Sequence, residues 1–473
     1  MNIIGRIEEQ NKLNDILKSN KPEFLVVYGR RRIGKTFLIK EFFQNKFSFY
    51  ATGVLSKKSK TQLYAFNTSL KEYGSKFSSI PENWIEAFNR LKSMIIDNTI
   101  KIDNRYNKRI IFLDELPWFD NGRSDFKAAF DLFWNSFAST QNNLVLIVCG
   151  SATSWILKNL INEKGGFHNR ITAKISLQPF NIKEVELLVN VQNGNDLSKQ
   201  EIIEAYMVFG GVPYYLNLIN RNFSLIQNID NICFRDGGDL INEYENLFSS
   251  LFDKYENHSK IINQLAKVKR GMSRNELLEA TKLASGSSFS KVLCELEECG
   301  FIRKYTNFKT SANNALYQLI DPFTLFSINF LKKKNFELWS NFVGQPGYYS
   351  WCGYAFEIVC INHINSIKKA LKIEGIDSLN YSYYNSKLGG AQIDLLIDRK
   401  DNIINLCEIK FSNSEFVIDK TYETNLMNKI NVFREDTKTK KSIQLTLITL
   451  NGLKKNNYSG IVRKDFTSDI LFD

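Results

Sequence analysis

Short runs of consecutive apolar residues alternate with helically spaced apolar positions in the first third of the chain. Three runs, at 23–28, 109–115 and 143–149, have the form of parallel strands that are covered on both faces. Residues 37–43 have helical spacing instead, and so does a phenylalanine stripe that we interpret as core, at 126, 130, 133 and 137. This alternation predicts a doubly wound, parallel α/β sheet.

The segment that joins the first strand to the first helix reads Gly-Arg-Arg-Arg-Ile-Gly-Lys-Thr over residues 29–36. In a strand–loop–helix of this pattern, backbone N–H groups and the helix N-terminus hold phosphates. Lys35 is expected to reach the β- and γ-phosphates, and the Thr36 hydroxyl to bind Mg²⁺. We therefore predict an ATP site formed by Gly29, Arg30, Arg31, Arg32, Ile33, Gly34, Lys35, Thr36 and Phe37.

Polar residues follow two of the predicted strands, at the sheet edge where catalytic groups are found. Asp114 is expected to hold Mg²⁺ through water, and Glu115 to orient the attacking water in phosphoryl transfer. The alternative is that these acids only cap the turn at 116–118. Ser151, after the third strand, would either sense the γ-phosphate or cap the next helix.

Several motifs together resemble the archaeal-type AAA+ ATPases, P-loop proteins related to the STAND signalling ATPases and to replication-initiator ATPases. The resemblance covers residues 1–235 and rests on Gly5-Arg6-x-Glu8-Glu9, the glycine loop with its three arginines, Asp114-Glu115, Gly150-Ser151 and Gly210-Gly211-Val-Pro213. It implies that Pro213 contacts the adenine region and that Arg6 lies near the base. It also implies Arg170 as a candidate arginine finger, although Arg170 could instead be an ordinary charge beside a helix.

The middle of the chain has the order of elements of a winged helix. Helical patterns at 261–266, 273–280 and 289–296 precede a strand that starts at 300. Ser273 and Glu276 form a capping-box pattern. The third helix could read the major groove of DNA, but its glutamates at 295, 297 and 298 favour a regulatory role against the nucleotide domain.

Two predicted strands in the last third, 389–399 and 403–411, are separated by the turn 400–402 and form a hairpin. Alternation places Glu408 and Lys410 on one face, and the antiparallel neighbour can bring Asp394 beside them. Asp394 and Glu408 would bind Mg²⁺ or Mn²⁺, and Lys410 would orient the nucleophile or stabilise charge. Glu357, on a preceding helix, would add a ligand.

This constellation resembles the PD-(D/E)xK nuclease superfamily. Residues 320–460 resemble, more closely, the nuclease-like domain that is often fused to archaeal-type ATPases. The matching motifs are Gly353-Tyr-x-Phe356-Glu357, Gly390-Ala-Gln-Ile-Asp394 and Glu408-Ile-Lys410. Two alternatives stay open, namely an exposed salt-bridged hairpin and a domain that binds without cleaving.

Composition and charge narrow the function classes. The net charge of +12 over 473 residues favours a polyanionic partner. No apolar run is long enough to cross a bilayer, and the N-terminus resembles no targeting segment, so we expect a cytoplasmic protein without a membrane partner. Seven cysteines without a C-x-x-C pair and only three histidines argue against disulfides and zinc, so the cysteines should be buried apolar residues.

These patterns predict an ATPase core at 1–180, a helical lid at 181–235, a winged-helix domain at 236–330 and a C-terminal α/β restriction-endonuclease-like domain at 331–473. The expected function is an AAA+ ATPase that binds and hydrolyses ATP with Mg²⁺ and controls a metal-dependent nuclease-like domain on DNA. The alternative is a non-nucleolytic STAND-type switch that gates partner or nucleic-acid binding. Whether the chain forms a homo-oligomer is left open.

Overall fold

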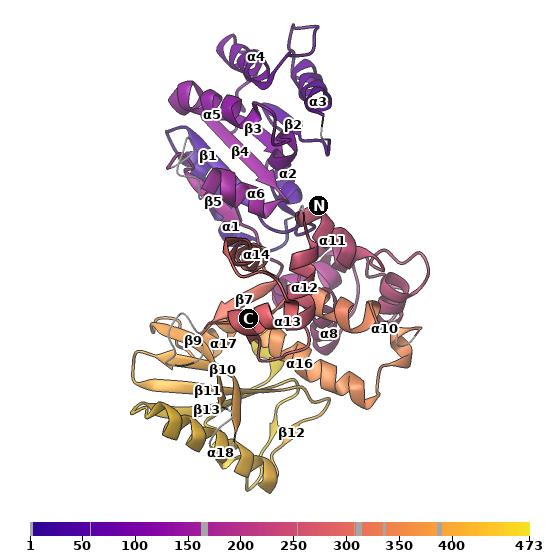
Figure 1. The fold of residues 1–473 in the computed structure, drawn as a ribbon, viewed down its shortest axis with the longest axis vertical. Coiled ribbons are helices and arrows are strands. Elements are labelled where there is room, and N and C mark those ends of the chain that lie inside the picture. Colours follow the sequence, from indigo (N-terminus) through magenta and orange to yellow (C-terminus); the bar gives the residue numbers. More distant parts are fainter. Residues whose placement is uncertain are drawn as a thin grey trace. The chain divides into compact units, whose positions relative to one another are not determined.

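The chain divides into two compact units. The computed structural model describes residues 3–56, 58–161, 169–252, 254–306, 308, 315–333, 337–385 and 390–473. The first unit comprises Met1–Gln178 with Ser250–Asp253, and the second comprises Pro179–Ser249 with Lys254–Asp473. Figure 1 shows the elements of both.

The first unit is built on a five-stranded sheet in which every pair is parallel, in the order β2-β3-β4-β1-β5. Its strands are β1 (Glu23–Tyr28), β2 (Phe49–Thr52), β3 (Arg109–Asp114), β4 (Leu144–Gly150) and β5 (Ala173–Ser176). The helices are α1 (Ile7–Lys18), α2 (Lys35–Phe42), α3 (Ser59–Glu72), α4 (Trp84–Ile96), α5 (Phe126–Ser136) and α6 (Thr153–Ile156).

Two separate apolar cores cover the two faces of this sheet. One contains side chains of α3, α4 and α5, including the predicted phenylalanine stripe, and the other contains side chains of α1 and α2. Alternate residues of β1 enter opposite cores, because strand side chains alternate between faces. The predicted doubly wound parallel sheet is therefore confirmed.

The second unit begins with helices and continues into a small antiparallel sheet. The helices are α7 (Ile182–Glu186), α8 (Lys199–Phe209), α9 (Pro213–Leu216), α10 (Leu225–Ile229), α11 (Glu243–Leu251, of which the last two residues belong to the first unit), α12 (Glu256–Leu265), α13 (Arg274–Thr281) and α14 (Ser287–Glu298). The sheet has the order β6-β8-β7, with β6 (Met272–Ser273), β7 (Ile302–Tyr305) and β8 (Leu316–Leu319). The predicted capping box of Ser273 and Glu276 begins α13 as expected.

A second five-stranded sheet, in the order β15-β13-β11-β10-β9, occupies the last part of the chain. Strands β9, β10 and β11 are antiparallel neighbours, whereas β11, β13 and β15 are parallel. The strands are β9 (Ser378–Asn385), β10 (Ala391–Arg399), β11 (Ile403–Lys410), β13 (Ser442–Thr449) and β15 (Lys464–Phe466), and β12 (Phe416–Val417) pairs with β14 (Leu453–Lys454). The helices are α15 (Pro322–Phe326), α16 (Pro346–Asn362), α17 (Ile364–Ala370) and α18 (Lys420–Thr437).

Helix α18 connects β11 to β13 and packs on one face of this second sheet. Its residues Leu426, Val432 and Phe433 share an apolar core with Leu406 of β11. Alternation along β11 puts Glu408 on the same face as Leu406. This packing brings side chains of α18 to the carboxyl end of β11, where Glu408 lies.

One expectation about the cysteines is wrong. All seven are free, but Cys294 is exposed while the other six are buried. The buried residues of α14 are Phe289, Val292, Leu293 and Leu296, so Cys294 lies on the opposite side of that helix. Among the residues described, no helix combines the length and the apolar character that crossing a membrane requires.

His363, directly after α16, is a buried link within the second unit. Its Nε2 accepts a hydrogen bond from the Ile182 backbone N–H at the start of α7 (3.0 Å), and its Nδ1 lies 2.7 Å from the Val359 carbonyl oxygen. An Nε2 that accepts leaves the ring proton on Nδ1, so the imidazole is neutral. Burial lowers the pKa of His363 to about 4.

Replacing His363 with Gln should flatten the pH dependence of unfolding of the second unit. Because the folded-state pKa is lowered, the stabilisation is complete above about pH 6.5 and is lost as the pH falls toward 4. Wild-type stability should therefore fall by ~2 kcal/mol between pH 7.5 and pH 5 from this residue, whereas Gln can accept the bond from Ile182 without titrating. Urea unfolding of both proteins at pH 7.5 and pH 5 measures the change in unfolding free energy with pH. An equal change in wild type and His363→Gln would refute the prediction.

Candidate functional site

The glycine loop between β1 and α2 requires glycine at two positions. Gly29 has a φ of 141°, and a Cβ there would lie 2.4 Å from the Leu177 carbonyl oxygen. Gly34 has a φ of 91° and precedes the first residue of α2. Lys35 is buried, and its Nζ donates to the carbonyl oxygens of Gly29 (2.9 Å) and Arg30 (2.8 Å). The loop, the start of α2 and one ammonium group thus share a single concave segment, which is an anion-binding arrangement.

The buried carboxylate of Asp114 lies beside this loop at the end of β3. The Thr36 hydroxyl donates to its Oδ1 (3.0 Å), and so does the Cys149 thiol (2.6 Å). Burial and the neighbouring carboxylate raise the pKa of Cys149, so this residue is a thiol that can donate. The structure brings together the two predicted magnesium ligands, Thr36 and Asp114. Cys149 was not predicted as a partner, although it ends the strand next to β3.

Glu115 and Ser151 contact one another. The Glu115 Oε2 accepts hydrogen bonds from the backbone N–H and from the hydroxyl of Ser151, both at 3.0 Å. The Glu115 side chain makes no capping bond to the short helix at Leu116–Phe119, and the residue that precedes α6 is Ala152. Neither of the two capping alternatives describes these side chains. Instead, the two side chains pair with each other at the carboxyl ends of β3 and β4.

The remaining predicted residues of the first site lie around the loop. The Arg6 guanidinium is buried and donates to the Ile33 carbonyl oxygen (3.4 Å). Arg30 is buried, Arg32 is partly buried, and Arg31 and Phe37 are exposed. Arg170 is exposed, and residues 162–168, just before it, lie outside the described part of the chain. Pro213 begins α9 in the second unit.

A second polar cluster surrounds Glu408 on β11. Glu408 is fully buried, so the alternative of an exposed salt-bridged hairpin does not hold. Its carboxylate accepts a hydrogen bond from the Tyr422 hydroxyl (2.7 Å) and pairs with Lys429 (2.8 Å) and Lys410 (3.0 Å). Burial acts to raise the pKa of Glu408, but the charges of Lys410 and Lys429 hold this pKa below its ordinary value.

Asp394 and Glu357 lie next to this cluster. The antiparallel register pairs Leu395 with Cys407, which places Asp394 opposite Glu408 as predicted. Burial and the Glu408 charge raise the pKa of Asp394 to about 6, and burial and the Asp394 charge raise that of Glu357 to about 8. The structure therefore gathers all four predicted residues, Glu357, Asp394, Glu408 and Lys410, in one region.

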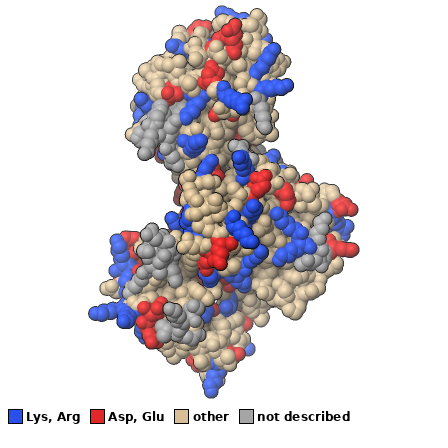
Figure 2. Space-filling model, viewed as in Figure 1, with Lys and Arg blue, Asp and Glu red and all other residues tan. Residues whose placement is uncertain are grey.

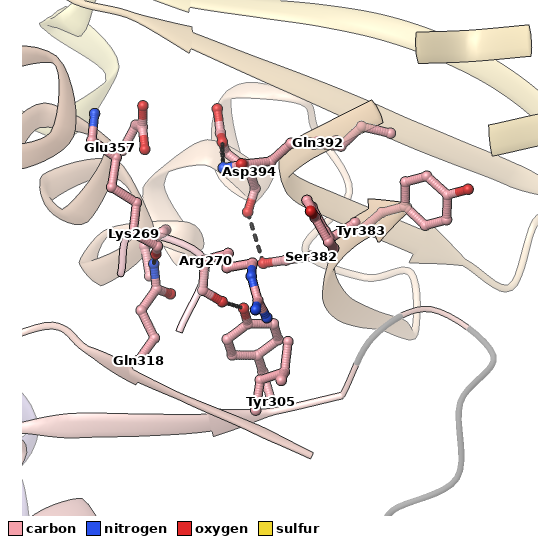
Figure 3. Close-up of a pocket in the computed structure, with 13 residues that line it drawn as sticks. Lys269, Arg270, Tyr305, Gln318, Glu357, Ser382, Tyr383, Gln392 and Asp394 are labelled. Carbon is pink, nitrogen blue, oxygen red and sulfur yellow. Dashed lines mark hydrogen bonds between the residues drawn. The ribbon is translucent and has the colours of Figure 1, made fainter. Parts of the chain in front are cut away.

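The three carboxylates do not form a compact ligand set. Within the described ranges, no three His, Cys, Asp or Glu side chains lie close enough together to hold a metal ion. The contacts of the three carboxylates also differ, because Glu408 pairs with Lys410 and Lys429 whereas Glu357 and Asp394 line a pocket (Figure 3).

Two residues of the Glu408 cluster were missed from the sequence. Tyr422 and Lys429 are both on α18, and seven residues apart they lie on one face of the helix. That spacing was visible, but only the packing of α18 on the second sheet shows that this face meets Glu408.

The glycine loop, the neighbouring carboxylate and the parallel sheet define the first unit as a P-loop ATPase. Residues 4–219 match a family described as an ATPase domain predominantly from Archaea. This part of the chain is therefore an archaeal-type ATPase domain, and that prediction is confirmed. The predicted nuclease-like domain stays a prediction.

Individual proteins give weaker likenesses. Over 343 residues the chain is 25% identical to an uncharacterised protein of Methanocaldococcus jannaschii, covering 69% of this chain and 68% of that protein. A stretch of 43 residues is 46% identical to an uncharacterised ATP-binding protein of the same organism, covering 9% of this chain and 73% of that protein.

Two of the solved structures that resemble the chain are the Walker-type ATPase of Pyrococcus abyssi and the ORC2 protein of Aeropyrum pernix. The first is 19% identical with a TM-score of 0.46, over 69% of this chain and 96% of that one. The second is 13% identical with a TM-score of 0.44, over 70% and 95%. With TM-scores below 0.5, the assignment of the first unit rests on the family match and on the geometry of the loop.

Replacing Lys429 with Met should destabilise the second unit by roughly 1–3 kcal/mol, because the buried Glu408 carboxylate loses a charged partner. The cost should shrink in a Glu408→Gln background, since the two side chains interact directly. Lys400→Met is the matched control, because Lys400 pairs with Asp377 on the surface and its loss should cost less than about 0.5 kcal/mol. Urea unfolding of the wild type, Lys429→Met, Glu408→Gln, the double variant and Lys400→Met measures these costs, and equal costs for Lys429→Met and Lys400→Met would contradict the prediction.

Proposed function

We propose that the chain is an ATP-hydrolysing switch whose nucleotide state controls a metal-dependent, nuclease-like domain acting on DNA. The observation that carries this proposal is the presence of two separate polar sites on one chain. One is the glycine loop with Asp114 in the first unit, and the other is the group of Glu357, Asp394, Glu408 and Lys410 in the second.

In the first site, the loop at 29–37 would hold the phosphates of ATP, and Lys35 would turn from its loop carbonyls to the β- and γ-phosphates. Thr36 and Asp114 would hold Mg²⁺, which neutralises phosphate charge in the transfer. Glu115 would exchange its hydrogen bonds to Ser151 for the attacking water. Ser151, at the end of β4, would contact the γ-phosphate. The roles implied by resemblance are contacts with the base or adenine region for Arg6 and Pro213 and an arginine finger for Arg170.

In the second site, Glu357 and Asp394 would hold Mg²⁺ or Mn²⁺, with Glu408 joining them, and the cation would activate water and polarise the scissile phosphate. Lys410 would then stabilise charge that develops on the phosphate, because its ammonium lies next to the same carboxylates. Burial and a neighbouring carboxylate charge raise the pKa values of Glu357 and Asp394, so a bound cation would favour their ionised forms, which supports this part of the proposal.

DNA as the partner is supported by the net charge of +12. Figure 2 shows that, on the face drawn, lysine and arginine side chains are interspersed with acidic ones. The charge therefore favours association with a polyanion at long range, while specific contacts would come from local sites.

One observation favours a second candidate, a non-nucleolytic STAND-type switch that gates partner or nucleic-acid binding. Glu408 already has Lys410, Lys429 and Tyr422 as partners, so its charge is balanced without a metal ion. A domain of this kind could bind without cleaving.

Glu115→Gln should bind ATP but hydrolyse it at least ~100-fold more slowly, because the amide cannot take up the proton of the attacking water. Lys35→Ala should lose ATP binding itself, since the ammonium near the phosphates is gone. Equilibrium binding of a fluorescent ATP analogue and phosphate release separate the two effects. Hydrolysis at the wild-type rate by Glu115→Gln would show that another residue orients the water.

Cleavage of plasmid and single-stranded DNA should require Mg²⁺ or Mn²⁺, differ with and without ATP, and vanish in Lys410→Ala. Lys400→Ala is the control, because Lys400 lies at the exposed turn of the same hairpin. Gel assays on the wild type, Lys410→Ala and Lys400→Ala measure the cleavage. No cutting by the wild type under any of these conditions would favour the non-nucleolytic switch instead.

A further inference from the structure

A pocket in the second unit joins the carboxylates Glu357 and Asp394 to residues of the small antiparallel sheet (Figure 3). One side is formed by α16, β9 and β10, which supply the carboxylates together with Ser382, Tyr384 and Gln392. The other side is formed by the segment before β6 and by β7 and β8, which supply Lys269, Arg270, Tyr305 and Gln318. The lining is cationic, aromatic and amide-bearing on one side, and anionic on the other.

The two sides are fixed to one another by side-chain contacts. The Arg303 guanidinium on β7 donates to the Ser382 hydroxyl (3.2 Å), and that hydroxyl donates to the Asp394 carbonyl oxygen (2.9 Å). The Arg270 guanidinium lies over the Tyr384 ring, 5.1 Å from its centroid. The small sheet is thus a built part of the pocket wall.

The backbone of residues 269 and 270 is held in place from the small sheet. The Gln318 amide donates to the Lys269 carbonyl oxygen (2.7 Å), and the Tyr305 hydroxyl donates to that of Arg270. Lys269 itself is exposed, and its ammonium lies 5.2 Å from the centroid of the Tyr354 ring on α16. A fixed backbone and a stacked side chain direct this ammonium toward Glu357.

Lys269 differs from the other cationic side chains near the carboxylates in its ion pairs. Lys410 and Lys429 both pair with Glu408, and Arg270 pairs with Glu276 at 2.7 Å. In the described part of the chain, Lys269 forms no ion pair within 4.0 Å, although its charge acts on Glu357 at longer range. Its three N–H donors therefore remain for a ligand that is both anionic and accessible from solvent.

We infer that Lys269 binds a backbone phosphate of a nucleic-acid strand that enters this pocket, so that the small sheet completes the carboxylate site. A phosphate has oxygens for both walls, because one can contact a cation held by the carboxylates while another accepts from the ammonium. Tyr384 and Gln392 are both exposed and offer a ring and an amide to an unpaired base. This inference rests on the proposed function and assigns a substrate contact to it.

The test is binding of a fluorescein-labelled, single-stranded oligonucleotide by the full chain in the presence of Ca²⁺, measured by anisotropy over a range of salt concentrations. Lys269→Ala should weaken binding about tenfold and make the slope of log affinity against log salt shallower by about one. Lys269→Arg should retain most of the affinity. Lys267→Ala is the matched control, because Lys267 is exposed in the same segment and donates to the Gln264 side chain; it should stay within about twofold of the wild type.

The outcomes separate this inference from the proposed function. Three results would each overturn the inference. Lys269→Ala could bind as tightly as Lys267→Ala, Lys269→Ala could bind more tightly and cleave faster than the wild type, or the wild type could fail to bind. If the wild type binds DNA through Lys269 but never cuts it, the inference stands while the nuclease proposal fails. If the wild type cuts DNA and Lys269→Ala cuts it with an unchanged KM, the proposal stands while the inference fails.

Discussion

The geometry of the nucleotide loop depends on one buried carboxylate at the carboxyl end of β3. Asp114 accepts hydrogen bonds from Thr36 at the start of α2 and from Cys149 at the end of β4. A buried charge without such donors would cost several kcal/mol. Because the donors come from different elements, satisfying this one group fixes the helix start against two neighbouring strands. The glycines at 29 and 34 then allow the loop to close over Lys35.

The second unit satisfies a buried carboxylate differently. Glu408 is paired with two lysines and a tyrosine, so its charge is balanced by the domain itself. Glu357 and Asp394 have no comparable set of paired cations, and burial together with a neighbouring carboxylate charge raises their pKa values. In the proposed metal site, a cation would compete with Lys410 and Lys429 for Glu408.

Sequence patterns predicted those features that a single element can encode. The strand at 23–28 was predicted with its observed bounds, and that at 109–114 to within one residue, because each has a run of apolar residues in its interior. Strands β2 and β5 were missed, since four-residue edge strands such as Ala173–Ser176 carry no such run. The pairing of Asp394 with Glu408 follows from hairpin register alone. Lys429, Cys149 and Lys269 could not be predicted, because each reaches its site from an element whose packing the local sequence does not encode.

The contacts around Asp394 also bear on how such a site is controlled. Ser382 bonds to the Asp394 backbone and is itself held by Arg303, so β7 of the small sheet is two hydrogen bonds away from the strand that carries a key carboxylate. A displacement of the small sheet would break the Arg303 bond and withdraw Lys269 from the pocket at the same time. In the proposed switch, a movement of the small sheet against β9 and β10 would reach these carboxylates without a long chain of coupled residues.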